Sequence, residues 1–175
     1  AFTRILAQTA RDAQRFRDLG ARAVEVCGNT KFDLTPPPKL LVRGHEWRAR
    51  LQRPVVLMAV SREGEEESLF DAWRAVPQPR PLLVVVPRHP QRFDDVAALA
   101  EQAGFSVARR STWTDEPPAD AMQRDVWLGD SMGEMPLYYA LADVALLGGS
   151  FAPLGGQNLI EAAACGCPLL MGQHT

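Results

Sequence analysis

The residues best suited to chemistry form a glycine-rich loop that leads into a predicted helix near the carboxyl end of the sequence. The loop contains two Gly-Gly pairs, 148–149 and 155–156, and glycine permits positive φ angles and close backbone approach. In the predicted helix, Gly156–Cys165, Asn158 and Glu161 are three residues apart and share a face. The unpaired N–H groups of a helix start favour a phosphate, and a carboxylate one turn later can accept hydrogen bonds from a ribose. The pattern therefore predicts a site for a nucleotide or a nucleotide-sugar.

Two further segments, 87–93 and 129–135, combine polar side chains with turn-forming residues at the ends of predicted strands. In PRHPQRF, Arg88 directly follows a predicted buried strand, so its guanidinium could donate two hydrogen bonds to a phosphate. The alternative is a solvent-exposed helix start. In GDSMGEM, the turn offers backbone groups that suit the polar edge of a base, and an equally good interpretation is a turn that caps the next helix.

The charged residues elsewhere are less specific. The segment SREGEEE, 61–67, gathers four glutamates around Gly64. We interpret them as acids in the first turn of a helix, where they complement its dipole, in preference to an acid–base pair. Lys31 is one of two lysines in the chain and follows a Gly-Asn turn. If it faces an interdomain cleft it could stabilise a leaving phosphate, and the alternative is an ordinary surface lysine.

Composition and charge argue against several function classes. The chain has 175 residues and a formal net charge of -2, with its basic residues scattered, which argues against a nucleic-acid partner. It has neither a GxxxxGK[ST] loop nor an early GxGxxG, which argues against a P-loop ATPase and a dinucleotide oxidoreductase. The histidines are far apart, so we expect no metal and no cofactor. No apolar run reaches the roughly 20 residues that span a bilayer, so a soluble segment is expected.

The elements that must position these loops alternate between apolar runs and helical patterns. The sequence predicts strands at 55–60, 82–86, 105–109, 126–128, 144–147 and 169–171, and helices at 63–75, 91–103, 135–141 and 156–165. Continuous runs such as LLVVV fit strands buried on both faces, with the helices as crossovers. We therefore predict an α/β fold with a Rossmann-like parallel sheet flanked by helices. Ligands bind at the carboxyl ends of the strands in such sheets, and the polar and glycine-rich loops fall there.

Three consecutive prolines, 36–38, mark a predicted domain boundary, because proline withholds a backbone donor from regular elements. We expect residues 1–33 to belong to a different unit, with a helix over Phe2–Leu19 that a few extended residues could precede, and a strand over Ala23–Cys27. Residues 34–50 are expected to be an interdomain linker. Residues 51–175 are expected to form the nucleotide-sugar-binding domain.

Six motifs occur in a fixed order along nearly the whole chain: LAQTARDAQRFRDLGA, GNTKFD, SREGEEE, PRHPQRF, LGDSMGEMPLYYALADVALLGGSF and GGQNLIEAAACGCPLLMGQHT. On these motifs the chain resembles the Kdo transferase family, which transfers 3-deoxy-D-manno-octulosonic acid (Kdo) from CMP-Kdo to the lipid A precursor. The resemblance implies the two-domain GT-B fold. Residues 1–33 would be the end of its amino-terminal, acceptor-side domain, and the rest of the chain would be its carboxyl-terminal half, incomplete at the carboxyl end. Ser61-Arg62, Gln157 and Ala162 depart from residues common in the family.

The resemblance also implies which residues form the site. CMP would be contacted by Pro87 and Arg88, by Met132, Gly133 and Glu134, and by Asn158, Leu159, Ile160 and Glu161. Lys31 matches the family lysine thought to stabilise the transition state, where it would compensate charge as the CMP phosphate departs. No metal or cofactor is implied.

The implied function is an inverting transfer in lipopolysaccharide biosynthesis, in which a lipid A hydroxyl displaces CMP. The full protein would associate peripherally with the cytoplasmic face of the bacterial inner membrane. The family's general base is a glutamate that would lie upstream of Ala1, so we expect this chain to bind the donor but not to turn it over alone. Two alternatives stay open: a nucleotide-sugar epimerase of the same architecture, which would prefer a uridine nucleotide, and a non-catalytic domain that binds a nucleotide or a partner protein.

Overall fold

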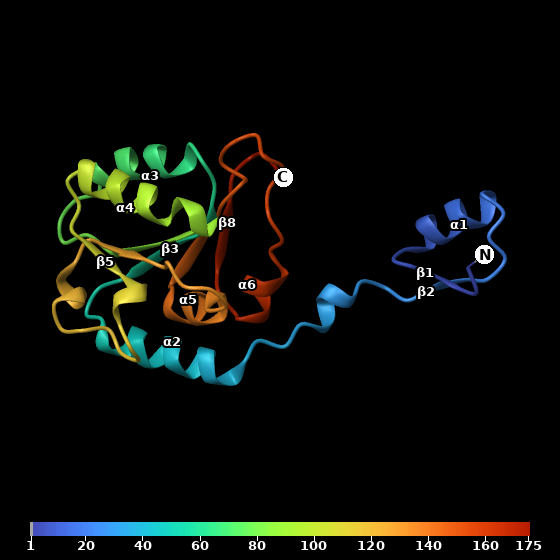
Figure 1. Cartoon of the computed structure of the whole chain (residues 1–175), viewed down its shortest axis with the longest axis horizontal. Helices are drawn as coiled ribbons and strands as arrows, with labels where there is room; N and C mark the ends of the chain where they lie inside the picture. The colour runs from blue at the N-terminus through green and yellow to red at the C-terminus, as the bar shows by residue number, and fades with distance from the viewer. Residues whose placement is uncertain (1) are drawn as a thin grey trace. The chain divides into compact units, whose positions relative to one another are not determined.

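The structure is a computed structural model that describes residues 2–175, the side chain of Thr30 excepted. The chain divides into two compact units, Ala1–Thr35 and Pro36–Thr175, called unit 1 and unit 2 below (Figure 1). The elements of unit 1 are β1 (Ile5–Ala7), α1 (Ala10–Asp18), β2 (Val24–Val26) and the 3-10 helix η1 (Thr30–Asp33). β1 and β2 pair in parallel, as the ends of a β–α–β connection. The expected strand over 23–27 is confirmed.

The helix expected over Phe2–Leu19 begins later than predicted. The Thr9 side chain accepts a hydrogen bond from the Asp12 N–H at 3.1 Å and thereby caps α1. The residues before this cap are extended and form β1, so the first part of the predicted helix is wrong.

Unit 2 is a parallel six-stranded sheet with helices on both faces. Its strands are β3 (Val55–Ser61), β4 (Leu82–Pro87), β5 (Val107–Arg109), β6 (Val126–Leu128), β7 (Val144–Leu147) and β8 (Leu169–Met171), in the spatial order β5-β6-β4-β3-β7-β8. Its helices are α2 (Pro38–Arg50), α3 (Glu65–Arg74), α4 (Phe93–Gln102), α5 (Met135–Leu141) and α6 (Ile160–Ala164), with 3-10 turns η2 (Pro90–Arg92), η3 (Arg110–Thr112) and η4 (Ala121–Gln123). The predicted α/β fold with a parallel sheet is confirmed.

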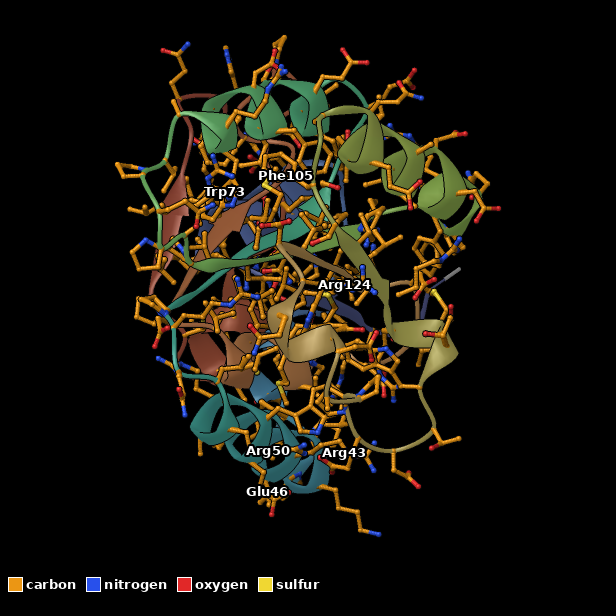
Figure 2. The ribbon with its side chains drawn as sticks, turned by 90° about the vertical axis from the view of Figure 1, so that its left-hand side faces the viewer. Arg43, Glu46, Arg50, Trp73, Phe105 and Arg124 are labelled. Atoms are coloured by element: carbon orange, nitrogen blue, oxygen red, sulfur yellow. The ribbon has the colours of Figure 1, made fainter. Side chains whose placement is uncertain are left out.

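Figure 1 shows α3 and α4 on one face of this sheet and α2, α5 and α6 on the other. Figure 2 shows Trp73 and Phe105 on the side of α3 and α4, and Arg43 and Arg50 on α2 across the sheet. Each face has its own buried apolar cluster. On the α2 side, Trp47 packs edge-on against two further tryptophans, with ring centroids 5.8 and 6.2 Å away. Two packed faces explain why the strands are continuous apolar runs.

The segment expected to be a linker, 34–50, is largely helical. α2 begins at Pro38, and proline suits the first turn of a helix because the missing N–H would be unpaired there in any case. Trp47 is fully buried in the core of unit 2. At Gly44 the helix approaches α5 so closely that a Cβ would lie 2.7 Å from Ala140 Cβ and nearer still to the Leu137 carbonyl oxygen. The triple proline therefore separates the units, but α2 belongs to unit 2.

The helix predicted over Gly156–Cys165 is also shorter than expected. α6 covers Ile160–Ala164, because Gly155 and Gly156 have φ angles of +81° and +72°, which a right-handed helix cannot use. Asn158 lies before the helix, where its Oδ1 accepts a hydrogen bond from the Ile160 N–H at 3.0 Å. Asn158 and Glu161 therefore do not share a helix face in the way the spacing suggested.

Candidate functional site

The carboxyl ends of all six strands of unit 2 lie at the same edge of the sheet, because every strand pair is parallel. The predicted nucleotide-binding residues follow β4, β6 and β7, at 87–88, 132–134 and 158–161. β4 is flanked by β6 and β3, and β3 is flanked by β7. The fold thus gathers the three segments at one edge, where α/β sheets bind ligands. Lys31 belongs to unit 1, where it is exposed in η1 and its N–H donates to Asn29 Oδ1 at 3.0 Å.

The end of β4 presents one arginine to solvent. Pro87 is buried as the last residue of the strand, and the Arg88 N–H donates to the Ser61 carbonyl of the neighbouring strand at 3.0 Å. The Arg88 side chain is exposed, and its guanidinium forms no hydrogen bond or ion pair within residues 2–175. Beside it, Val60 has a φ of +51°, a left-handed conformation that a β-branched residue rarely adopts. Backbone strain of this kind, of order 1–3 kcal/mol, is typical of functional edges.

The loop after β6 is held by the segment after β5. Asp130 accepts hydrogen bonds from Arg109 Nε, from the Ser111 N–H and from Ser111 Oγ, each at 2.7 Å. Glu134 accepts one from the largely buried Arg110 at 2.8 Å. These charged contacts fix the loop from both of its ends.

Because Glu134 is engaged in this way, its carboxylate has little left to offer a ligand. It also accepts a hydrogen bond from Ser131 Oγ, which in turn contacts Tyr138 Oη at 2.8 Å. Between these anchors, Gly133 adopts a positive φ of +78° and Met132 is 74% exposed. The loop can thus present backbone groups and a methionine side chain to a planar base, with Glu134 positioning them.

The glycine loop after β7 differs from its sequence-based interpretation. Its backbone N–H groups at Gly149, Phe151 and Ala152 donate to the carboxylate of Glu65, at 2.8, 3.1 and 3.3 Å. These N–H groups therefore already bind an anion that belongs to the protein itself, whereas the sequence pattern predicted a phosphate at the start of the helix after this loop. From the sequence, Glu65 was interpreted only as a first-turn acid. The sequence signal that could have indicated a further role is the glycine directly before it, Gly64, which is left-handed in the structure with a φ of +87°.

The segment 158–161 offers an amide and a carboxylate. Asn158 is exposed and Leu159 is 42% exposed, whereas Ile160 and Glu161 are partly buried. Burial raises the pKa of the Glu161 carboxyl above its ordinary 4.5. Within residues 2–175 this carboxylate has no hydrogen-bond partner. α6 has five residues and contributes little dipole, so the carboxylate, which can accept hydroxyl hydrogen bonds, is the main chemical feature here.

In residues 2–175, no three His, Cys, Asp or Glu side chains are grouped so that they could hold a metal ion. Among the helices of the same residues, none combines the length and the apolar character needed to cross a bilayer.

Comparison with known proteins gives a consistent result. A family model described as 3-deoxy-D-manno-octulosonic-acid transferase (kdotransferase) matches residues 1–34. The chain is 50% identical to the 3-deoxy-D-manno-octulosonic acid transferase of Bordetella pertussis, over 98% of this chain and 41% of that protein. It is 38% identical to the transferase of the same name from Haemophilus influenzae, over 98% of this chain and 40% of that protein. The chain thus spans about two fifths of the length of these curated relatives.

A solved structure is also similar to this chain. It is the C-terminal CMP-Kdo binding domain of WaaA from Acinetobacter baumannii, with a TM-score of 0.65 and 29% sequence identity. The likeness covers 76% of this chain and 70% of that domain.

Proposed function

The chain belongs to the family of 3-deoxy-D-manno-octulosonic acid (Kdo) transferases, and we propose that its unit 2 binds CMP-Kdo, the ligand for which the similar Acinetobacter domain is named. The observation that carries the proposal is the gathering of three segments at one edge of the sheet, two of which keep a charged side chain without an internal partner among residues 2–175. These two side chains are Arg88 and Glu161, a cation and an anion. Together they suit a ligand that has both a phosphate and hydroxyl groups.

The proposed contacts follow from the chemistry of each segment. Arg88 binds the phosphate, because a guanidinium pairs with phosphate oxygens through two hydrogen bonds. The backbone of Met132–Glu134 contacts the polar edge of the cytosine. At the ribose, the Asn158 side-chain amide donates a hydrogen bond and the Glu161 carboxylate accepts hydrogen bonds from the hydroxyls, with Leu159 and Ile160 beside them. Pro87 ends the strand that presents Arg88.

The reaction proposed for the whole protein is an inverting displacement. A hydroxyl of the lipid A precursor attacks the anomeric carbon of Kdo, the bond to the CMP phosphate breaks, and CMP leaves. Lys31 compensates the charge that develops on the departing phosphate, an electrostatic role that requires no proton transfer. The general base is assigned by family resemblance to a part of the relatives that this chain does not match, so the chain alone binds the donor without turnover. The acceptor places the whole protein peripherally at the cytoplasmic face of the inner membrane.

The test is a titration of the 175-residue chain with CMP and with UMP. Calorimetry measures the affinity, and thermal unfolding measures the gain in stability. CMP is expected to raise the unfolding free energy by about 2.7 kcal/mol when its concentration is one hundred times Kd. UMP, which lacks the cytosine amino group, is expected to bind more weakly. Tighter binding of UMP would indicate the epimerase-type alternative, and a folded chain that binds neither nucleotide would contradict the proposal.

A further inference from the structure

Two consecutive glutamates at the start of α3, Glu65 and Glu66, reach the loops of the two strands that flank β3. Both are buried, with 4% and 0% of their surface exposed. Glu66 accepts hydrogen bonds from Ser61 Oγ and from Arg92 in η2, each at 2.8 Å, and so engages the segment after β4. Glu65 reaches the opposite way, to the glycine loop after β7. Buried carboxylates persist when they are paired or hydrogen-bonded. Both oxygens of Glu65 accept hydrogen bonds, whereas Glu66 is held through Oε1 alone and its Oε2 has no partner among the described residues.

The contacts of Glu65 resemble those of a bound anion. One oxygen accepts hydrogen bonds from the Gly149 and Arg62 N–H groups at 2.8 and 2.9 Å. The other accepts from the Phe151 and Ala152 N–H groups at 3.1 and 3.3 Å. Four backbone donors from two loops therefore converge on one side chain. Neutralising that side chain would leave some of these donors, in a buried place, without an acceptor.

The glycine loop that Glu65 binds is hydrogen-bonded to the residues just before the segment 158–161. The carbonyl of Gly149, whose N–H is bound by Glu65, accepts a hydrogen bond from the Gly156 N–H at 2.7 Å. Gly149 has a φ of +72°, and a Cβ there would lie 3.2 Å from the Gly156 carbonyl oxygen and 3.3 Å from the side-chain Nε2 of Gln157. Asn158 follows at once and holds the Ile160 N–H. A hydrogen bond thus joins Gly149, which Glu65 binds, to Gly156, which lies two residues before Asn158.

We propose that Glu65 is a positioning residue for the nucleotide: its buried carboxylate fixes the glycine loop so that Asn158 and Glu161 are set for the ribose. The inference rests on the proposed binding of CMP-Kdo by unit 2. Glu65 does not touch the nucleotide itself. The N–H groups of the glycine loop bind this internal carboxylate, and the loop acts on the nucleotide through the segment that follows it.

The test compares Glu65→Gln with Glu67→Gln in the 175-residue chain, with CMP as the probe. Both variants remove one negative charge from the first turn of α3, but Glu67 is exposed and forms no hydrogen bond within residues 2–175. A glutamine at 65 keeps one acceptor oxygen and replaces the other with a donor. We expect the Kd for CMP to rise about tenfold or more in the Glu65→Gln variant and to change less than about twofold in the Glu67→Gln variant, since only the first loses charged hydrogen bonds. Both are measured at a temperature where circular dichroism shows them folded.

A second readout separates positioning from a general loss of stability. The NMR signals of the Gly149, Phe151 and Ala152 amides are expected to shift and to exchange faster in Glu65→Gln without CMP, while core amides of β4 keep their protection. If Glu65→Gln does not fold, Glu65→Asp is measured instead, with the same expected direction. Equal CMP affinity of the position-65 variant and Glu67→Gln would overturn the inference. Failure of the unmodified chain to bind CMP would overturn the proposed function, and with it this inference.

Discussion

At the scale of single residues, the side chains at the sheet edge differ in whether the protein itself already uses them. Glu134 is bound by Arg110, and Asp130 by Arg109 and Ser111. Arg88 and Glu161, in contrast, have no internal partner among residues 2–175. The resemblance to the transferase family selected Arg88, Glu134 and Glu161 alike. In the structure, Glu134 holds a loop, whereas Arg88 and Glu161 are available to a ligand.

The availability of Arg88 leads to a first prediction. Because its guanidinium is exposed and unpartnered within the described residues, Arg88→Ala should leave the unfolding free energy within about 0.5 kcal/mol of the original chain. Loss of a hydrogen bond to a charged phosphate should weaken CMP binding by about 1.5–3 kcal/mol, roughly tenfold to a hundredfold in Kd. The matched control is Arg74→Ala, at the far end of α3, where the arginine pairs with Asp71. Equal CMP affinity of the two variants, measured by calorimetry, would show that Arg88 does not bind the phosphate.

The raised pKa of Glu161 leads to a second prediction, on pH. Burial disfavours the charged carboxylate in the folded chain, so Glu161 loses its proton at a lower pH in the unfolded chain than in the folded one. The contribution of Glu161 to the unfolding free energy therefore falls as pH rises above about 4.5. Ribose hydroxyls donate hydrogen bonds to the carboxylate and favour its charged form. CMP binding should therefore release a proton from Glu161, and CMP affinity should increase as pH rises through the raised pKa.

The control for this pH dependence is Glu161→Gln, which cannot titrate. The CMP phosphate titrates in both proteins, so the difference between their pH profiles isolates Glu161. Calorimetry between pH 4.5 and 7.5 measures both profiles, starting near the ordinary pKa of 4.5. Parallel profiles would show that the carboxylate does not take part in binding.

At the scale of elements, the packing of α2 on α5 determines whether unit 2 keeps the site in place. α5 begins directly after the Met132–Glu134 loop, and α2 contacts it at Gly44. A side chain at this position has no space, because a Cβ would meet Ala140 at 2.7 Å and the helix backbone at Leu137. The glycine is therefore required by close approach of two helices.

Gly44→Ala should accordingly destabilise unit 2 by about 1–3 kcal/mol, as overpacking of a core does, although alanine favours helix formation. The measurement is the urea midpoint of unfolding. Val42→Ala on the same helix serves as the control, since Val42 is 55% exposed and its change should stay within about 0.5 kcal/mol. A Gly44→Ala variant as stable as Val42→Ala would mean that α2 does not pack on α5 as described.

The elements also show what sequence patterns can and cannot predict. β3, β4, β6, β7 and β8 were predicted to within a residue, because strands buried on both faces leave continuous apolar runs. β5 is shorter than predicted, since Phe105 lies before the strand and packs against Phe70 with ring centroids 5.9 Å apart. α2 was missed because the prolines before it were interpreted as the start of a long linker, and few of its residues are buried.

The site was predictable as three segments but not as a network of contacts. Motif resemblance and the rule on strand ends placed the segments at one edge of the sheet. The roles of Glu65 and Glu66 depend on the order of the strands. β3 lies between β7 and β4, and this order lets Glu65 reach the loop after β7 and Glu66 the segment after β4. A local pattern of charges contains no information on that order.

At the scale of the whole molecule, the chain consists of two units, and they contribute different residues to the proposed reaction. Unit 1 contains Lys31, and unit 2 contains the proposed nucleotide contacts. The chain spans 41% and 40% of the two transferases to which it was compared. Donor binding is therefore proposed for unit 2, and the 175-residue chain is sufficient to test that claim.

The most direct test of that claim is a crystal structure of the chain with CMP. We predict that the phosphate lies against Arg88, the cytosine against the backbone of Met132–Glu134, and the ribose hydroxyls against Glu161, while Glu65 keeps its hydrogen bonds to the glycine loop. CMP bound at the opposite edge of the sheet, or bound with its phosphate on the Gly149, Phe151 and Ala152 amides in place of Glu65, would contradict it.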